Sequence, residues 1–205
     1  MKGDPAGAEA GPDCPPDSGE KTSGRERKVL PGKLQELWDG MEENRRVTLA
    51  MISGLSDSEF VRRNEGEWSI AEILEHLVLA ETGISKLIRK MLKENAGKLP
   101  PYPADDSGIG VRETGRPAER MTEAPEVAHP KGSHGKEEIL RLAGQARDAT
   151  RTSLEMLAGV DPRSVEFPHP FFGGMNLYEW PRRIIVEHER QHHSQIERIL
   201  RSLRK

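Results

Sequence analysis

The sequence predicts an all-α protein, and specifically a four-helix bundle preceded by an unstructured tail. Four separate stretches place apolar residues at intervals of three and four, which is the spacing of one face of an α-helix. Aromatic residues make up only 4% of the chain and charged residues 32%, which suits helices with long polar faces better than a β-sandwich or barrel. At 205 residues the chain is long enough for one well-buried domain.

The N-terminal segment, residues 1–28, is dominated by Gly, Pro, Asp, Glu and Ser and has almost no bulky apolar side chains. Such a segment cannot bury enough surface to offset the entropy lost on ordering, so we expect a disordered tail and a bundle domain over residues 30–205. The single cysteine, Cys14, lies in this tail, which excludes a disulfide framework and a cysteine-ligated metal site.

The first expected helix runs from about Gly32 to Ser53. Its apolar stripe consists of Leu34, Leu37, Trp38, Met41, Leu49 and Ile52. The second helix opens with Ser69 followed by Glu72 three residues later, which is a capping box, and it continues to about Glu94. Its main stripe consists of Ile70, Leu74, Leu77, Ile84, Ile88 and Met91.

The third expected helix runs from about Lys136 to Ala158, with its apolar stripe at Ile139, Leu142, Ala146, Leu154 and Leu157. The fourth opens at Asn176, which can cap a helix that has Glu179 three residues on, and it ends near Leu203. Pro181 falls in the first turn of this helix, where a missing N–H costs little.

Two connections between these helices are long. Residues 96–135, between the second and third helices, are rich in Pro and Gly, and a loop of this length is normally functional or disordered. We expect its histidines, His129 and His134, to be solvated. The connection over residues 161–175 contains His169 between two prolines, which we predict to be a turn residue, with a place at the entrance of a site as the alternative.

His188 and His192 are four residues apart on the fourth expected helix. This spacing places both imidazoles on one side, about one turn apart, where a single metal ion can reach both. A helical wheel stepped from Leu177 places the pair in the apolar stripe, so we expect the bundle to bury them and to expose His193. Gln195 falls in the same stripe, as a partner of a ligand or as a buried amide.

A third ligand is needed, and His76 on the second helix is the best candidate. It lies about 100° from the main stripe, on a flank that can face the fourth helix, although a boundary histidine bonded to solvent fits the wheel equally well. The structural alternative for the whole cluster is that each imidazole hydrogen-bonds to a neighbouring helix. Glu187 and Glu189 turn away from the stripe, so we interpret them as solvated residues.

Three segments resemble the DinB-like, or YfiT-type, superfamily of four-helix proteins. They are WSIAEILEHL at residues 68–77, PHPFFG at 168–173 and HERQHHSQI at 188–196, and the resemblance spans about residues 30–203. In that family a histidine on the second helix joins two on the last helix to bind a divalent metal ion. The resemblance therefore implies His76, His188 and His192 as metal ligands, and it implies a homodimer.

Three neutral imidazoles leave at least one coordination position open, which is the pattern of a catalytic metal site. Zinc is the default ion for such a set, with nickel, iron and manganese as alternatives. The family includes transferases and isomerases that use low-molecular-weight thiols, and others described only as metal-dependent hydrolases. The resemblance thus implies a thiol S-transferase or hydrolase acting on a small molecule; the alternative is a non-enzymatic stress-response or ligand-sensing bundle with structural histidines.

Charge and hydropathy argue against other partners. The net charge of −3 is close to balance, so we expect no nucleic-acid partner. The basic C-terminal residues, Arg198, Arg201, Arg204 and Lys205, are explained as cations that complement the end of a helix. The sequence contains no apolar run of about 18 residues and no apolar core of a signal peptide, so we expect a soluble, cytoplasmic protein with no membrane partner.

Overall fold

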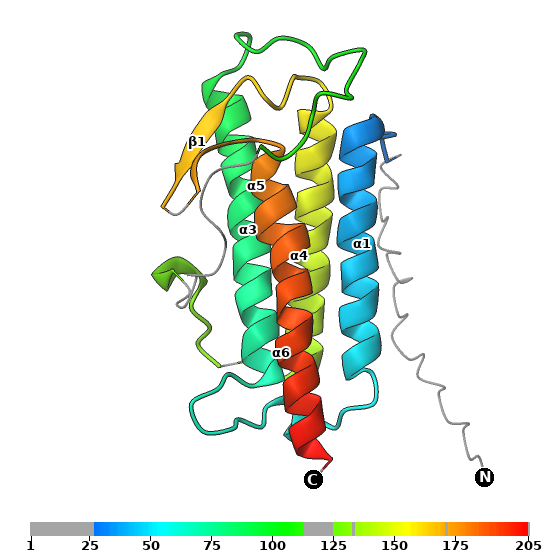
Figure 1. Cartoon of the computed structure of the whole chain (residues 1–205), viewed down its shortest axis with the longest axis vertical. Helices are drawn as coiled ribbons and strands as arrows, with labels where there is room; N and C mark the ends of the chain where they lie inside the picture. The colour runs from blue at the N-terminus through cyan, green and yellow to red at the C-terminus, as the bar shows by residue number, and fades with distance from the viewer. Residues whose placement is uncertain (1–26, 113–124, 133, 171, 205) are drawn as a thin grey trace, which may run out of the picture.

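Four long helices form the bundle that the sequence predicts (Figure 1). The computed structural model describes residues 27–112, 125–132, 134–170 and 172–204, so the predicted tail, with Cys14, lies almost entirely outside the described residues. The long helices are α1 (Gly32–Ile52), α3 (Ile70–Glu94), α4 (Lys136–Leu157) and a final helix made of α5 (Glu179–Pro181), the π-helical turn η3 (Arg182–Glu187) and α6 (His188–Leu203). Two short helices, α2 (Asp57–Phe60) and η2 (Glu126–Ala128), lie in the connections.

The direction of the helices explains the long connection over residues 96–135. α1 and the final helix run one way, whereas α3 and α4 lie side by side and run the other way (Figure 1). A chain that leaves the end of α3 must therefore travel back along the whole bundle before α4 can begin. Such a crossover is one of the known connections of four-helix bundles. Its described parts include η2, whereas residues 113–124 lie outside the described chain.

The predicted capping box at Ser69 is confirmed, and the predicted pair of bonds between Asn176 and Glu179 is present, although the final helix starts at Glu179 and not at Asn176. The Ser69 hydroxyl accepts a hydrogen bond from the N–H of Glu72 (3.2 Å), and the Glu72 carboxylate accepts one from the N–H of Ser69 (2.8 Å). At the final helix, the Asn176 side chain accepts from the N–H of Glu179 (2.9 Å), and the Glu179 carboxylate accepts from the N–H of Asn176 (2.9 Å). These reciprocal bonds satisfy N–H groups that have no partner within the helix.

A β-hairpin occupies part of the second connection, where the sequence predicts only a loop. Strand β1 (Glu166–His169) pairs antiparallel with β2 (Gly173–Asn176), with Phe167 opposite Met175. Gly173 has a φ of +74°, a conformation that side chains disfavour, and it starts the second strand. Four-residue strands are too short to show a clear alternation, which is why periodicity misses them.

The bundle core consists of two apolar clusters. One is built around Leu34, Met41, Ile88, Leu154 and Ile185, and the other around Phe60, Ile73, Ile139 and Ile196. Between them, every long helix contributes buried polar side chains, which include Arg147, Glu81, Glu189 and Thr48. The predicted stripes are buried with few exceptions; Leu49 is 41% exposed, so its assignment to the core is wrong.

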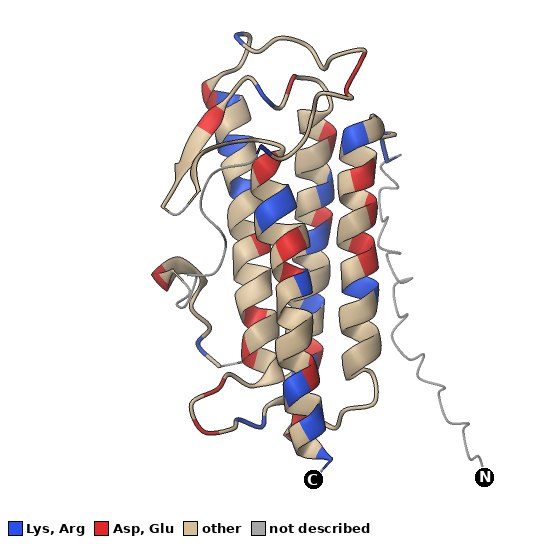
Figure 2. Ribbon diagram, in the orientation of Figure 1, with Lys and Arg blue, Asp and Glu red and all other residues tan. Residues whose placement is uncertain are grey.

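Acidic and basic residues are interspersed along all four long helices (Figure 2). This distribution agrees with the nearly balanced net charge of −3. Within the described residues, none of the helices combines the length and apolar character that crossing a membrane requires.

Candidate metal centre

Three imidazoles from two helices converge at one point on the wall of the bundle. His76 comes from α3, and His188 and His192 come from α6. The Nε2 atom of His188 lies 3.2 Å from that of His76 and 3.1 Å from that of His192, and the three ligand atoms all lie within 4.8 Å of one another. Nitrogens bound to one tetrahedral zinc ion are about 3.4 Å apart, so only a small adjustment would give each of them a metal bond. The structure thus brings together the three residues predicted as ligands.

In His76 and His192, the hydrogen bond of Nδ1 determines that Nε2 presents its lone pair to the centre. Nδ1 of His76 lies 2.7 Å from the Ala128 carbonyl, and Nδ1 of His192 lies 2.8 Å from Oε1 of Gln195. Both oxygens can only accept, so each Nδ1 carries the hydrogen and each neutral Nε2 presents a lone pair. This second contact orients a ligand in the way expected around metal sites.

His188 differs from the other two imidazoles. Its Nδ1 is buried and forms no hydrogen bond with any described residue. The Ile184 carbonyl lies close enough to raise the pKa of the ring, against the larger effect of burial. Without a cation, the one hydrogen that a neutral His188 can place on Nε2 satisfies only one of the two neighbouring lone pairs. With a cation at the centre, all three Nε2 atoms become ligands. The donor set therefore fits a divalent ion that accepts nitrogen ligands.

The cluster favours neutral imidazoles. Burial, followed by the neighbouring imidazoles of His192 and His76, lowers the pKa of His188 to about 3. Burial, followed by the imidazole of His76, lowers the pKa of His192 to about 4. Burial also lowers the pKa of His76, against the effect of its bond to the Ala128 carbonyl. The neutral form is the one that binds metal, because protonation would occupy the ligand lone pair.

The side chains of the histidine pair on α6 do not point at the bundle axis, which corrects the orientation that the helical wheel predicts. His188 and His192 are partly exposed and face the space between α3 and α6, whereas Glu189 is only 2% exposed and points into the core. The wheel stepped from Leu177 fails because the helix starts at Glu179 and contains the π-helical turn η3. A π-helical turn contains more residues than an α-helical turn, so it changes the face on which every later residue lies.

His193, which the wheel places in solvent, is also partly buried. Its Nε2 lies 3.0 Å from the Thr48 hydroxyl, which donates a hydrogen bond to Glu189 (2.8 Å). His193 therefore contacts the core on the side of α6 away from the three-histidine centre. Its exclusion from the metal ligands agrees with this placement.

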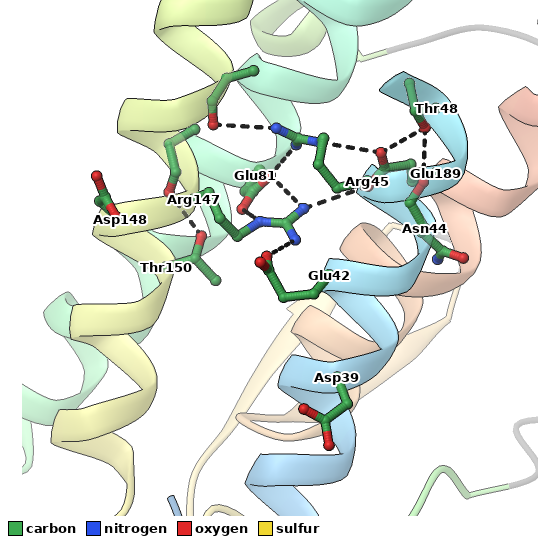
Figure 3. Close-up of polar contacts among 12 residues, drawn as sticks. Asp39, Glu42, Asn44, Arg45, Thr48, Glu81, Arg147, Asp148, Thr150 and Glu189 are labelled. Atoms are coloured by element: carbon green, nitrogen blue, oxygen red, sulfur yellow. Dashed lines mark hydrogen bonds and ion pairs between the residues drawn. The ribbon is translucent and has the colours of Figure 1, made fainter. Parts of the chain in front are cut away.

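Four charged side chains, Arg45, Glu81, Arg147 and Glu189, form a network across the bundle, which we call the polar layer (Figure 3). Arg45 pairs with Glu81 (2.9 Å) and Glu189 (3.3 Å), and Arg147 pairs with the same two carboxylates (2.8 and 3.5 Å). Each residue comes from a different long helix. Since Glu189 directly follows His188, the polar layer fixes the rotation of α6 that directs His188 toward α3.

A cavity of about 1000 Å³ opens beside the three imidazoles, between α3, the final helix, η2 and the hairpin. Gln195 and His169, the predicted residues around the site, both line it. His169 is a strand residue rather than a turn residue, 8% exposed, and its ring lies 5.0 Å from that of Trp180. The place of His169 at the cavity supports the alternative role that the sequence left open.

The connection through η2 is tied to α3 next to His76. The Glu75 carboxylate accepts a hydrogen bond from the N–H of Gly132 (2.9 Å) and lies 3.8 Å from Nε2 of His134. His129 is exposed as predicted, but it also lines the cavity, with its ring 5.7 Å from that of Trp68. The crossover thus supplies both the Ala128 carbonyl and one wall of the cavity.

The polar layer is the functional support that sequence reasoning missed. Glu81 lies four residues after Leu77 and three before Ile84, so a carboxylate stands inside the apolar stripe of α3. Arg147 interrupts the stripe of α4 in the same way, next to Ala146. Charges at stripe positions on two helices are a signal for a buried ion pair. Glu189 gives the same signal, since it lies seven residues before the buried Ile196 on α6 and so shares its face, and the prediction that Glu189 is solvated is wrong.

The fold and the site define a class of protein: a four-helix bundle with an α3/α4 crossover and three histidines that converge beside an open cavity. The chain belongs to the DinB superfamily, whose family model matches residues 41–196. This membership confirms the resemblance that the three sequence motifs indicated.

One relative and one solved structure agree with the family assignment. The chain is 29% identical over 160 residues to the uncharacterised protein YuaE of Bacillus subtilis (strain 168), which covers 77% of this chain and 93% of that protein. The crystal structure of TT2238, a four-helix bundle protein, matches with a TM-score of 0.54 and 20% identity, over 80% of this chain and 98% of that one. At this identity the structural match supports the fold alone.

Proposed function

We propose that the protein is a metal-dependent enzyme, a thiol S-transferase or a hydrolase, that acts on a small molecule bound in the cavity beside His76, His188 and His192. The observation that carries the proposal is the convergence of three Nε2 atoms at a cavity of about 1000 Å³. A purely structural histidine cluster has no need for an adjoining space of that size. A catalytic site needs it, because a substrate must reach the ion.

A divalent ion held by the three imidazoles would supply Lewis-acid chemistry, which lowers the pKa of a water or thiol that it binds. The protein residues do the positioning. Gln195 and the Ala128 carbonyl orient His192 and His76, and the polar layer holds the helix that carries His188. In the transferase alternative, a carbon–sulfur bond forms while the bond to the leaving group breaks, and the thiol proton is released with that group.

Metal analysis of the purified protein is the first test. We expect about one divalent ion per chain in the wild type, bound most tightly when the ion is zinc or nickel. His188→Ala should lose the ion, whereas His193→Ala, a substitution whose side chain faces Thr48 and not the centre, should retain it. An equal metal content in the wild type and in His188→Ala would contradict the proposed site.

A thiol-transfer screen then distinguishes the two reactions. The metal-loaded protein is incubated with monobromobimane and, in turn, bacillithiol, mycothiol or glutathione. Conjugation that one thiol supports and His188→Ala abolishes would establish a transferase. Metal-dependent cleavage of an ester or amide without any thiol would establish a hydrolase, and a metal-replete protein inactive in every assay would favour a non-enzymatic sensor.

A further inference from the structure

The cavity continues beyond the histidine centre on both sides, and one extension follows α3 toward the hairpin. Along α3, the cavity wall passes from His76 through Ala80 and Gly83 to Leu87. Leu87 lies eleven positions after His76, which corresponds to about 16 Å along the helix axis. A ligand bound at the imidazoles would thus find an extended arm of the cavity in the direction of the hairpin.

This arm has mostly apolar walls, with the imidazole of His169 as a polar group beside Trp180 at the hairpin end. From α3 it is lined by Leu79, Ile84 and Leu87, and from the final helix by Ile184 and Trp180, all of which lie on the same side of the histidine centre. The indole N–H of Trp180 donates to the Phe167 carbonyl (3.2 Å), so the ring presents its apolar surface to the arm. Pro170 of the hairpin borders the same end of the cavity.

Gly83 leaves space in the middle of the arm. Gly83, like the cavity itself, is open to the surface, and a Cβ atom placed on this glycine would meet nothing within 4 Å. Glycine inside a helix is unfavourable relative to alanine by about 0.5–1 kcal/mol, so its presence here is not explained by helix stability. A bound molecule lying across α3 would account for the open space.

The opposite end of the cavity has a different character. It is bordered by the polar side chains of Gln195, Glu67 and Arg198 beside the ring of Trp68, and the guanidinium of Arg198 already pairs with the Glu67 carboxylate (3.0 Å). An apolar group placed there would have to desolvate polar side chains. The two ends thus give the site a direction, with the reactive centre between a polar mouth and an apolar arm.

We propose that the substrate carries its reactive group at one end of an extended apolar tail, alkyl or flat aromatic, and that this tail lies in the arm of the cavity between Gly83 and Trp180. The proposal deepens and rests on the proposed metal-dependent function. It assigns Leu87, Ile184 and Trp180 as specificity-determining residues, because they would contact the apolar tail of the substrate and not its reacting group.

The test uses straight-chain hydroxamates, from acetohydroxamate to octanohydroxamate, as probes of the zinc-loaded full-length protein. The hydroxamate group chelates the ion and the chain extends into the arm. Titration calorimetry should show the affinity rising about fourfold for each added methylene, because each buries apolar surface. The emission maximum of Trp180, isolated in a Trp38→Phe/Trp68→Phe background, should shift further to shorter wavelength as the chain lengthens and excludes water from the ring.

Gly83→Leu is the decisive variant. The new side chain should fill the arm without a clash, reduce the affinity for octanohydroxamate at least tenfold and leave acetohydroxamate and zinc binding unchanged. Gly144→Leu is the matched control, since Gly144 is exposed on α4, does not line the cavity and would likewise have nothing within 4 Å of an added Cβ atom. Both substitutions replace a helical glycine, so they share any general effect on helix stability.

The outcomes separate this proposal from the one on which it rests. Affinity that is independent of chain length, or equal effects of Gly83→Leu and Gly144→Leu, would overturn the apolar arm while leaving the metal centre intact. If acetohydroxamate does not bind in a zinc-dependent manner, the metal-dependent function fails and the proposal fails with it. A chain-length effect that Gly83→Leu removes and Gly144→Leu preserves supports the arm.

Discussion

Two of the three imidazoles of the candidate centre combine a ligand nitrogen with a second contact that orients the ring. His76 uses a backbone carbonyl of the crossover, and His192 uses the side chain of Gln195, one turn further along the same helix. The first contact depends on the fold, whereas the second is local to α6. These two contacts therefore differ in how they can be tested.

Gln195→Ala should weaken metal binding by about 10–100-fold, because His192 loses the acceptor that fixes its tautomer and orientation. Competition with a chromophoric chelator measures the dissociation constant. Gln191→Ala is the control, since Gln191 also lines the cavity but is exposed and is not bonded to a predicted ligand. Equal loss of affinity in both variants would contradict the positioning role of Gln195.

The pKa shifts of His188 and His192 predict the pH dependence of the metal-free protein. Burial lowers the pKa of His188 to about 3 and that of His192 to about 4, below the value of 6.5 for a free histidine. The unfolded chain therefore binds protons first as the pH falls. Stability should be complete above about pH 6.5 and should decrease below it, by up to about 1.4 kcal/mol per pH unit for each residue.

Urea denaturation of the metal-free protein between pH 7 and about pH 5 measures this slope. The double variant His188→Gln/His192→Gln removes both groups, so its free energy of unfolding should vary less with pH than that of the wild type. A slope that the double substitution leaves unchanged would assign the pH dependence to carboxylates instead of the histidine cluster.

At the level of elements, a π-helical turn and the buried carboxylate of Glu189 set the rotation of α6 about its own axis. Glu189, 2% exposed, is held by Arg45, Arg147 and Thr48, and His188 on the adjacent position is thereby directed to α3. A buried ion network does not by itself imply high stability, since desolvation offsets the attraction. Its consequence here is a single rotational setting of the helix.

Glu189→Ala should destabilise the protein by about 3–5 kcal/mol, because two arginines lose a buried partner. Metal affinity should fall as well, since α6 loses the contact that sets its rotation. Glu197→Ala, which removes an exposed carboxylate of α6 paired with Arg201 at 3.8 Å, should change stability by less than about 0.5 kcal/mol. Denaturant unfolding of the two variants would contradict the role of the polar layer if the losses were equal.

For the whole molecule, a metal ion at the centre would link two helices that are far apart in the sequence. His76 and His188 are separated by 112 residues. The ligand geometry exists only when α3 and α6 are packed together, so ion binding must favour the folded state over the unfolded chain. The centre should therefore act as a cross-link in thermal unfolding.

Zinc at about 100 times its dissociation constant should stabilise the protein by about 2.7 kcal/mol, which corresponds to a rise in Tm of about 5–10 °C. His76→Ala should abolish the rise, whereas His129→Ala, on the cavity wall but outside the cluster, should retain it. Differential scanning fluorimetry with and without a chelator makes the measurement. A zinc-dependent rise that survives His76→Ala would exclude a link between α3 and α6.

The sequence alone determined the features that depend on neighbours along the chain. The capping boxes at Ser69 and Asn176, the bounds of the long helices and the four-residue spacing of His188 and His192 follow from local hydrogen bonds and helical periodicity. The family motifs added His76. Each of these depends on contacts within a few residues, which a single sequence displays directly.

Only the tertiary structure decided how the helices face one another. The turn η3 changed the side on which His188, His192 and Glu189 lie, and the parallel course of α3 and α4 required the crossover that delivers the Ala128 carbonyl. The apolar arm exists because residues from three separate segments line one space. Such features depend on long-range packing and on the phase of a whole helix, which no local pattern in the sequence records.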